Sequence, residues 1–195
     1  MKKLLLAGKA ILGAGLIIIF LNSCKNETKQ EDPQEVAEES NEAKFDSIDT
    51  KEDDSQYIVD IASINLSEIE LGKLAQTKST NPEVKKFGKM MVDDHTKLAS
   101  EVSALAKTKN FTLPTSLTEE GQEEYNKLNE KTGVDFDKKF ADMMVDGHQK
   151  AIDKVKKTAE NATDQDVKLW ASNNVAGLTA HLEHAKLLKE SLDKK

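Results

Sequence analysis

Residues 85–97 read KKFGKMMVDDHTK, and residues 138–150 read KKFADMMVDGHQK. Nine of the thirteen positions agree, and each copy carries one histidine, His95 in the first and His148 in the second. The apolar residues of both copies recur every three or four positions, which is typical of an amphipathic helix. Each copy therefore predicts a long helix whose histidine lies on the face that turns towards the core.

Apolar residues recur at this spacing in four long segments, which predict an all-α fold, a four-helix bundle over residues 55–192. The predicted helices cover residues 55–78, 82–107, 135–161 and about 163–192. Residues 108–133 break the pattern around one short polar helical stretch. They predict a long, partly helical crossover between two helical hairpins.

The chain begins with basic residues and an apolar run over residues 10–20, and it then reads LNSC up to Cys24. This layout predicts a secretory signal over residues 1–23. The LNSC stretch resembles a bacterial lipobox, which implies cleavage before Cys24 and attachment of lipid to it. By the same resemblance, Lys25 at the next position favours an outer-membrane lipoprotein of the cell envelope, facing the periplasm or the exterior. The alternative is an uncleaved anchor with an incidental cysteine.

Residues 24–54 predict an acidic, disordered tether between the lipid and the bundle. Residues 25–54 hold twelve acids against four lysines and show no helical stripe. Such a composition repels itself and buries little apolar surface.

The net charge of −7 and the absence of arginine exclude nucleic acid as the main partner. We expect the membrane as a partner, through the lipid, and envelope proteins as further candidates. The sequence does not set the oligomeric state.

One polar residue on each long helix falls within its apolar stripe: Glu68, His95, His148 and His181. Partners within each hairpin differ in height by roughly 3–7 Å at the rise of an α-helix. Because an unpaired buried polar group costs about 1–3 kcal/mol, these four must pair with one another, with water or with a metal ion. The pattern predicts one site in the core, either a metal site or a Glu–His hydrogen-bond network.

Three imidazoles and one carboxylate suit Zn(II), Fe(II), Mn(II) or Cu(II), and the sequence does not choose among these metals. Met91 and Met144 each lie one turn before a histidine, where thioether sulfur would favour Cu(I) and core packing is the other interpretation. His184 lies about 60° from His181 around the last helix and is a further candidate ligand. Asp94 is interpreted as a solvated acid at the edge of the core.

Five motifs occur in order: SEIELGKLA (67–75), MVDDH (91–95), GxxFD (133–137), MVxxH (144–148) and HLxxAK (181–186). Together they resemble a ferritin-like family of exported bacterial proteins of unknown function, often called putative outer-membrane proteins. The resemblance covers about residues 55–192 and implies a ferritin-like four-helix fold. The recurrent polar residues of the family would correspond to Glu68, His95, His148 and His181. The resemblance implies no activity.

An enzyme is not favoured. Di-iron members of the wider fold use Glu-x-x-His on two helices, whereas Val92, Val145 and Leu178 stand three residues before the histidines here. A ferroxidase or oxygenase is therefore poorly supported, and no nucleotide loop or nucleophile motif is present. Two functions stay open: a lipid-anchored envelope protein that binds a transition metal, and a structural or interaction module whose histidines only organise the core.

Overall fold

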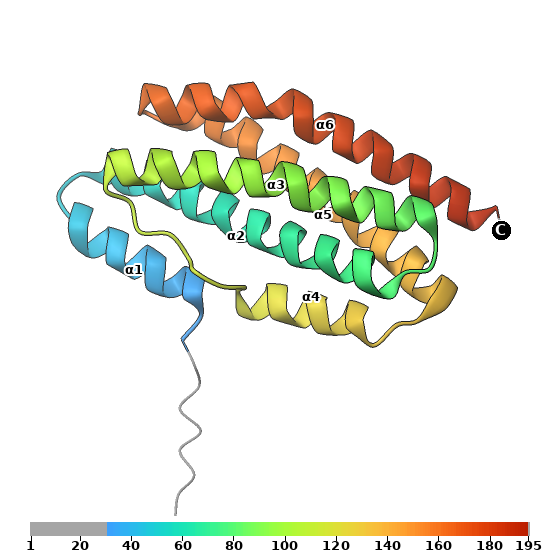
Figure 1. The fold of residues 1–195 in the computed structure, drawn as a ribbon. Coiled ribbons are helices and arrows are strands. Elements are labelled where there is room, and N and C mark those ends of the chain that lie inside the picture. Colours follow the sequence, from blue (N-terminus) through green and yellow to red (C-terminus); the bar gives the residue numbers. More distant parts are fainter. Residues whose placement is uncertain (1–30, 195) are drawn as a thin grey trace, which may run out of the picture. The chain divides into compact units, whose positions relative to one another are not determined.

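The computed structural model describes residues 31–194, which form six α-helices and no strand (Figure 1). The helices are α1 (Pro33–Phe45), α2 (Asp49–Lys78), α3 (Pro82–Lys109), α4 (Glu119–Asn129), α5 (Gly133–Asn161) and α6 (Gln165–Asp193). The predicted all-α bundle is confirmed, and α4 is the helical part of the predicted crossover. The predicted signal over residues 1–23 and Cys24 lie outside the described residues.

Two helical hairpins build the bundle. Short connections join α2 to α3 and α5 to α6, so the members of each pair run antiparallel and pack closely (Figure 1). Between the hairpins, α2 packs against α5, while α3 and α6 touch more sparingly. The α2–α5 face is thus the tighter side of the bundle, and the α3–α6 face is the looser one.

Local sequence fixes where α3 and α6 begin. The Asn81 side chain accepts a hydrogen bond from the Glu83 amide at 3.0 Å, and Pro82 occupies the first turn of α3. The Asp164 side chain caps α6 in the same way, accepting from the Asp166 amide at 2.9 Å. Such caps satisfy amide groups that no intrahelical carbonyl can reach.

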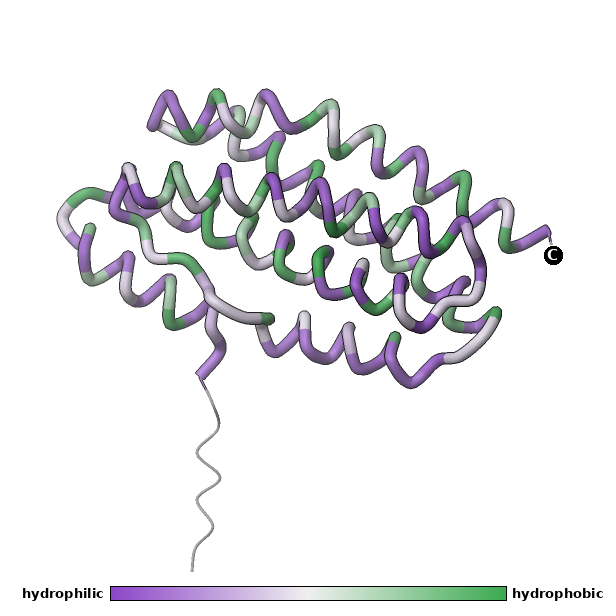
Figure 2. Tube along the Cα trace, viewed as in Figure 1, coloured by the Kyte–Doolittle hydropathy of each residue, from purple (hydrophilic) through white to green (hydrophobic). Residues whose placement is uncertain are grey.

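The two copies of the repeated stretch meet in the core. Phe87 of the first copy and Phe140 of the second pack edge to face, with ring centroids 6.1 Å apart. Gly88, which follows Phe87, lies against Gly72 of α2, and a Cβ on either glycine would be 2.8 Å from the carbonyl oxygen of the other. Figure 2 shows hydrophobic and hydrophilic residues alternating along the long helices, as amphipathic packing requires.

The prediction of a disordered tether over residues 24–54 is wrong for the described part of that range. Residues 33–45 form α1, and α2 begins at Asp49, six residues before the predicted start of the bundle. Phe45 packs edge to face on Phe111 with centroids 5.7 Å apart, and the Asn41 amide exchanges hydrogen bonds with the backbone of Thr112. A few well-placed residues therefore fix α1 to the crossover in spite of its acidic composition.

Asp54 shows that the bundle includes residues before the predicted start at residue 55. Its buried carboxylate accepts hydrogen bonds from the amides of Thr163 and Asp164, at 2.8 and 2.7 Å, and from the Thr163 hydroxyl at 2.8 Å. This acid holds the turn between α5 and α6, so residues predicted to belong to the tether are part of the bundle.

None of the helices in residues 31–194 combines the length and the apolar character that a membrane span needs.

Candidate metal centre

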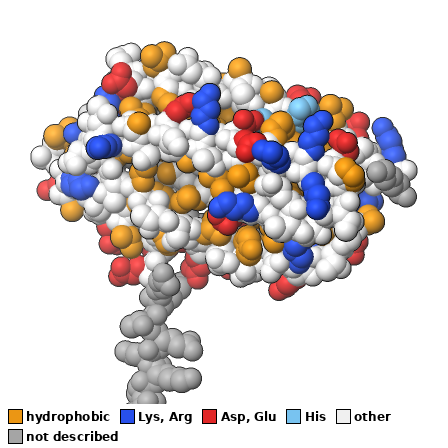
Figure 3. All heavy atoms as spheres, in the orientation of Figure 1, with side chains coloured by type: hydrophobic (Ala, Val, Ile, Leu, Met, Phe, Trp, Pro, Cys, Tyr) orange, Lys and Arg blue, Asp and Glu red, His pale blue; other side chains and the backbone are white. Residues whose placement is uncertain are grey.

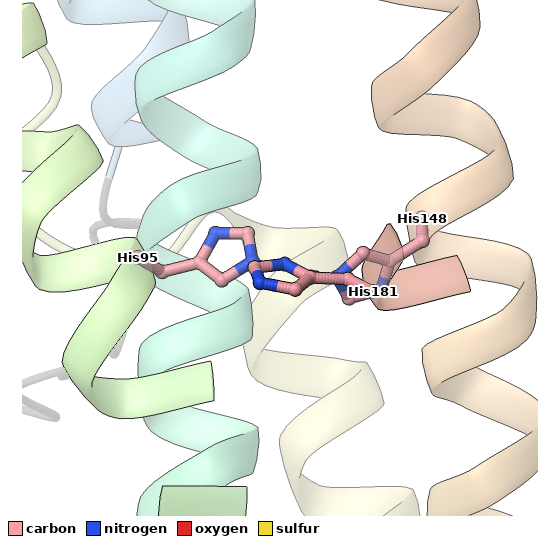
Figure 4. Close-up of side chains that lie close together, drawn as sticks. All are labelled: His95, His148 and His181. Atoms are coloured by element: carbon pink, nitrogen blue, oxygen red, sulfur yellow. Dashed lines mark hydrogen bonds between the residues drawn. The ribbon is translucent and has the colours of Figure 1, made fainter. Parts of the chain in front are cut away.

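Three of the four predicted site residues come together in the middle of the bundle. His95 on α3, His148 on α5 and His181 on α6 turn their rings towards one another (Figure 4). One ring nitrogen from each lies within 4.8 Å of the other two, and the Nε2 atoms of His95 and His148 are 3.4 Å apart. These three residues are called the histidine cluster below.

Each ring of the cluster is fixed by a hydrogen bond on its outer side. His148 donates from Nδ1 to the carbonyl oxygen of Met144 at 2.8 Å, and a carbonyl can only accept. His95 donates from Nδ1 to Oδ1 of Asn65 at 2.8 Å. In both neutral rings the proton is then on Nδ1, so the two Nε2 lone pairs face each other.

His181 follows the same scheme with its nitrogens exchanged. Its Nε2 donates to Oδ2 of Asp94 at 3.0 Å, while its Nδ1 is buried and has no hydrogen-bond partner. Each of the three rings is therefore held from outside through one of its two nitrogens. Oxygen acceptors that hold the opposite nitrogen are the usual surroundings of metal-binding histidines, because they fix the tautomer and the ring orientation.

Burial keeps His95 and His148 neutral. His95 and His148 have no exposed surface, and His181 retains 8%. Burial lowers the pKa of His95 well below its ordinary value, and the neighbouring His148 and His181 lower it further. Burial also lowers the pKa of His148 to about 4, although the hydrogen bond to Met144 acts in the opposite direction. At neutral pH both rings can offer a lone pair to a ligand.

The spacing fits a small metal ion. An ion bound to both Nε2 atoms, which are 3.4 Å apart, at ~2.0–2.1 Å from each would see them at an angle of about 110°. That angle suits tetrahedral and trigonal coordination. Two facing lone pairs at this distance repel each other, and a cation between them removes the repulsion.

Glu68 does not join the cluster. Its Oε1 lies 3.5 Å from Nδ1 of His148, on the side of the ring that faces away from the free lone pairs. Its Oε2 is buried without a hydrogen-bond partner. Burial, together with the nearby Glu124 carboxylate, raises the pKa of Glu68 to about 8. Its role as a metal ligand stays a prediction, and the position of its carboxylate does not support it.

The other candidate ligands have surroundings that account for them without a metal ion. Met91 and Met144 are fully buried in the same hydrophobic cluster as Phe87 and Phe140, where core packing accounts for them. His184 is exposed, and its ring lies edge to face on Phe87, with the centroids 6.4 Å apart. Direct ligation by these three residues stays a prediction.

Sequence reasoning missed the residues that orient the cluster. Asp94 was interpreted as a solvated acid at the edge of the core. Its side chain is 51% exposed, but that interpretation overlooked the hydrogen bond that its carboxylate accepts from His181. Asn65 lies three residues before Glu68, on the same face of α2, and this position was the available signal for it. For Asp94 the signal was the repeat itself, since glycine stands at the matching position of the second copy.

Two buried hydrogen-bond donors, one on Asn65 and one on Trp170, lie beside His95. The Nδ2 of Asn65 and the Nε1 of Trp170 are buried donors without a hydrogen-bond partner. Both residues line a cavity of about 10 Å³, which also reaches His95. This space is about the smallest that can hold one water molecule, which would accept from both donors and hold the Asn65 amide in place.

Comparison with known proteins identifies a family and a fold. The family model described as "Domain of unknown function (DUF4142)" matches residues 37–188, so the match begins within α1. Solved structures of CopM in the Cu(II)-bound and the Cu(I)-bound form are similar, with a TM-score of 0.60 for each. Sequence identity is 16% and 17%, and the alignments cover 71% of this chain and 96% of the CopM chain. At that identity the likeness shows the fold alone. No curated protein matches the chain.

Proposed function

The chain belongs to the DUF4142 family, and we propose that it binds one transition-metal ion through His95, His148 and His181. The observation that carries the proposal is the hydrogen bonding of the cluster. Three imidazoles are each held from outside by an oxygen acceptor, so the second nitrogen of every ring is not used by that acceptor and can serve a ligand. A hydrogen-bond network without metal would need a proton between the two Nε2 atoms, and both protons are already used on Nδ1.

Copper is the metal that we propose. Three imidazoles suit copper and zinc alike, so the nitrogen donors do not decide between them. Met91 and Met144 lie one turn before His95 and His148, and a thioether brought to the cluster would supply the soft ligand that Cu(I) prefers. The similar fold of CopM, which holds copper in two oxidation states, supports the same choice.

The place of action that we propose is the cell envelope. The basic start, the apolar run and the LNSC stretch support export and lipid attachment at Cys24, with the outer membrane as the anchor. A metal-binding bundle held there would sequester or buffer copper. This role requires no chemical reaction, in keeping with the lack of catalytic motifs.

Metal analysis and calorimetry test the proposal. The full chain carrying Cys24→Ser, so that the thiol cannot compete, is titrated with Cu(I), Cu(II) and Zn(II). We expect a copper dissociation constant tighter than about 10 µM. His95→Ala and His148→Ala should each weaken binding by at least about 100-fold, more than the loss of a residue that only orients a ligand.

His184→Ala is the matched control, since it removes an exposed imidazole outside the cluster, and it should bind as the unchanged chain does. If the unchanged chain binds none of these metals, or if His95→Ala and His148→Ala bind equally well, the metal site is wrong. The histidines would then organise the core of a structural or interaction module. Tighter binding of zinc than of copper would overturn the choice of metal alone.

A further inference from the structure

The histidine cluster is not equally shielded on all sides. His95 and His148 have no contact with solvent, whereas His181 retains 8% of its surface. The Asp94 side chain, which accepts the hydrogen bond of His181, is 51% exposed. The ring of His181 therefore links an exposed carboxylate on one side to the buried lone pairs on the other.

Asp94, His181 and His184 lie where α6 passes over α3, and this line of polar residues is called the α3–α6 seam below. His184 packs against Phe87 of α3, one turn along α6 from His181. Histidine atoms are visible on the surface of this face in Figure 3, near acidic and lysine side chains. Because α3 and α6 make the sparser contact between the hairpins, side chains in the seam can move without breaking the core.

The larger opening in the bundle leads elsewhere. A cavity of about 560 Å³ lies between α2, α4 and α5, with Glu68, Glu124 and Gly147 among its lining residues. Glu68, which lines this cavity, lies on the Nδ1 side of His148, and that nitrogen donates its proton to the carbonyl oxygen of Met144. An ion in this cavity would face a protonated nitrogen with the ring between it and the free lone pairs.

We propose that the metal ion reaches and leaves the histidine cluster through the α3–α6 seam, with the Asp94 carboxylate as its first contact. The inference rests on the proposed function and adds a route to it. A hydrated cation is drawn to the exposed carboxylate. It then displaces the hydrogen bond between Asp94 and His181, and the His181 side chain moves aside to admit it to His95 and His148. Asp94 thus has two roles: it orients His181 in the closed state and receives the ion in the open state.

Stopped-flow mixing with copper(II) chloride tests the route. Trp170 is the only tryptophan of the chain and lines the small cavity beside His95, so Cu(II) in the cluster should quench its fluorescence. Asp94→Asn keeps an oxygen acceptor for His181 but removes the charge. We expect its association rate to fall by about threefold or more at low ionic strength, and its salt dependence to weaken.

Two variants serve as matched controls. Asp93→Asn removes the neighbouring acid of α3, which is 58% exposed and pairs with Lys89 at 2.5 Å, away from the seam. Glu124→Gln removes an acid of the large cavity. Both should bind at the unchanged rate. An unchanged rate for Asp94→Asn, or an equal loss of rate for Glu124→Gln, would overturn the route while the binding itself stands. No copper binding by the unchanged chain would overturn the proposed function instead.

Discussion

The two copies of the repeated stretch agree at nine of thirteen positions, yet their histidines have different surroundings. His95 is held by the side chain of Asn65 on another helix, whereas His148 is held by the carbonyl of Met144 in its own helix. The residue before the histidine also differs, being Asp94 in the first copy and Gly147 in the second. The shared positions therefore build the same inward helix face twice, and the differing ones adapt each copy to its neighbours.

Asp94 and Gly147 occupy the same position of the repeat, but the first makes a hydrogen bond and the second lies in a close contact. Asp94 faces α6, where its carboxylate accepts a hydrogen bond from His181 at 3.0 Å. Gly147 faces α2, where a Cβ would come within 2.5 Å of Oε1 of Glu68. One copy thus needs an acceptor at this position, while the other needs empty space.

Replacing Gly147 of the second copy by the aspartate of the first copy should have the largest effect on stability. Gly147→Asp places a side chain and a charge against buried Glu68, so we expect the free energy of unfolding to fall by at least about 3 kcal/mol. Gly147→Ala, which adds the Cβ alone, should cost about 1–3 kcal/mol. Urea unfolding of the metal-free full chain measures both changes.

Gly177 of α6 supplies the control, because a Cβ there would meet no atom within 4 Å. Gly177→Ala should raise the free energy of unfolding by about 0.5–1 kcal/mol, since glycine is the poorer helix former. A stable Gly147→Asp protein would show that Glu68 moves aside easily and that the close contact has little weight.

Glu68, which lies against Gly147 of the second copy, should make the stability of the fold depend on pH. Its pKa is raised from 4.5 to about 8, so the folded chain holds a proton that the unfolded chain has released. Stability should therefore fall as pH rises from 4.5 to 8. His95 and His148, whose pKa values are lowered from 6.5, affect stability mainly below pH 6.5. Between pH 6.5 and 8 we expect a loss of about 2 kcal/mol from Glu68.

Urea unfolding of the metal-free chain at several pH values checks this trend. Glu68→Gln has no proton to lose, so its free energy of unfolding should stay level between pH 6.5 and 8. An equally steep decline in the Gln protein would mean that another group causes the loss.

Replacing Asp94 of the first copy by the glycine of the second copy should have the smallest effect on stability. Asp94→Gly removes the acceptor of His181 from a half-exposed position, and neighbouring Asp93→Gly makes the same exchange without touching the cluster. Both variants place glycine in α3, so that cost is common to them. We expect Asp94→Gly to be less stable than Asp93→Gly by about 1 kcal/mol, the value of one hydrogen bond. Equal stabilities in urea would mean that the bond to His181 contributes nothing.

The long helices could be predicted because helical periodicity is a local property of the sequence. The repeat, the cap at Asn81 and the apolar stripes placed four helices to within a few residues, with the exception of the start of α2. The short helix α1 could not be predicted in this way. Its acidic composition indicates disorder, and the contacts of Asn41 and Phe45 that hold it are to residues some 70 positions away.

The sequence by itself determined that His95, His148 and His181 face inward at similar heights, because the angle and rise per residue of a helix are fixed. Only the tertiary structure decided that these three meet while Glu68 lies behind His148. It also decided which nitrogen of each ring is free, since the acceptors of His95 and His181 come from other helices. Partners across helices depend on how the helices are packed and rotated, and the periodicity of one segment carries no record of its neighbours.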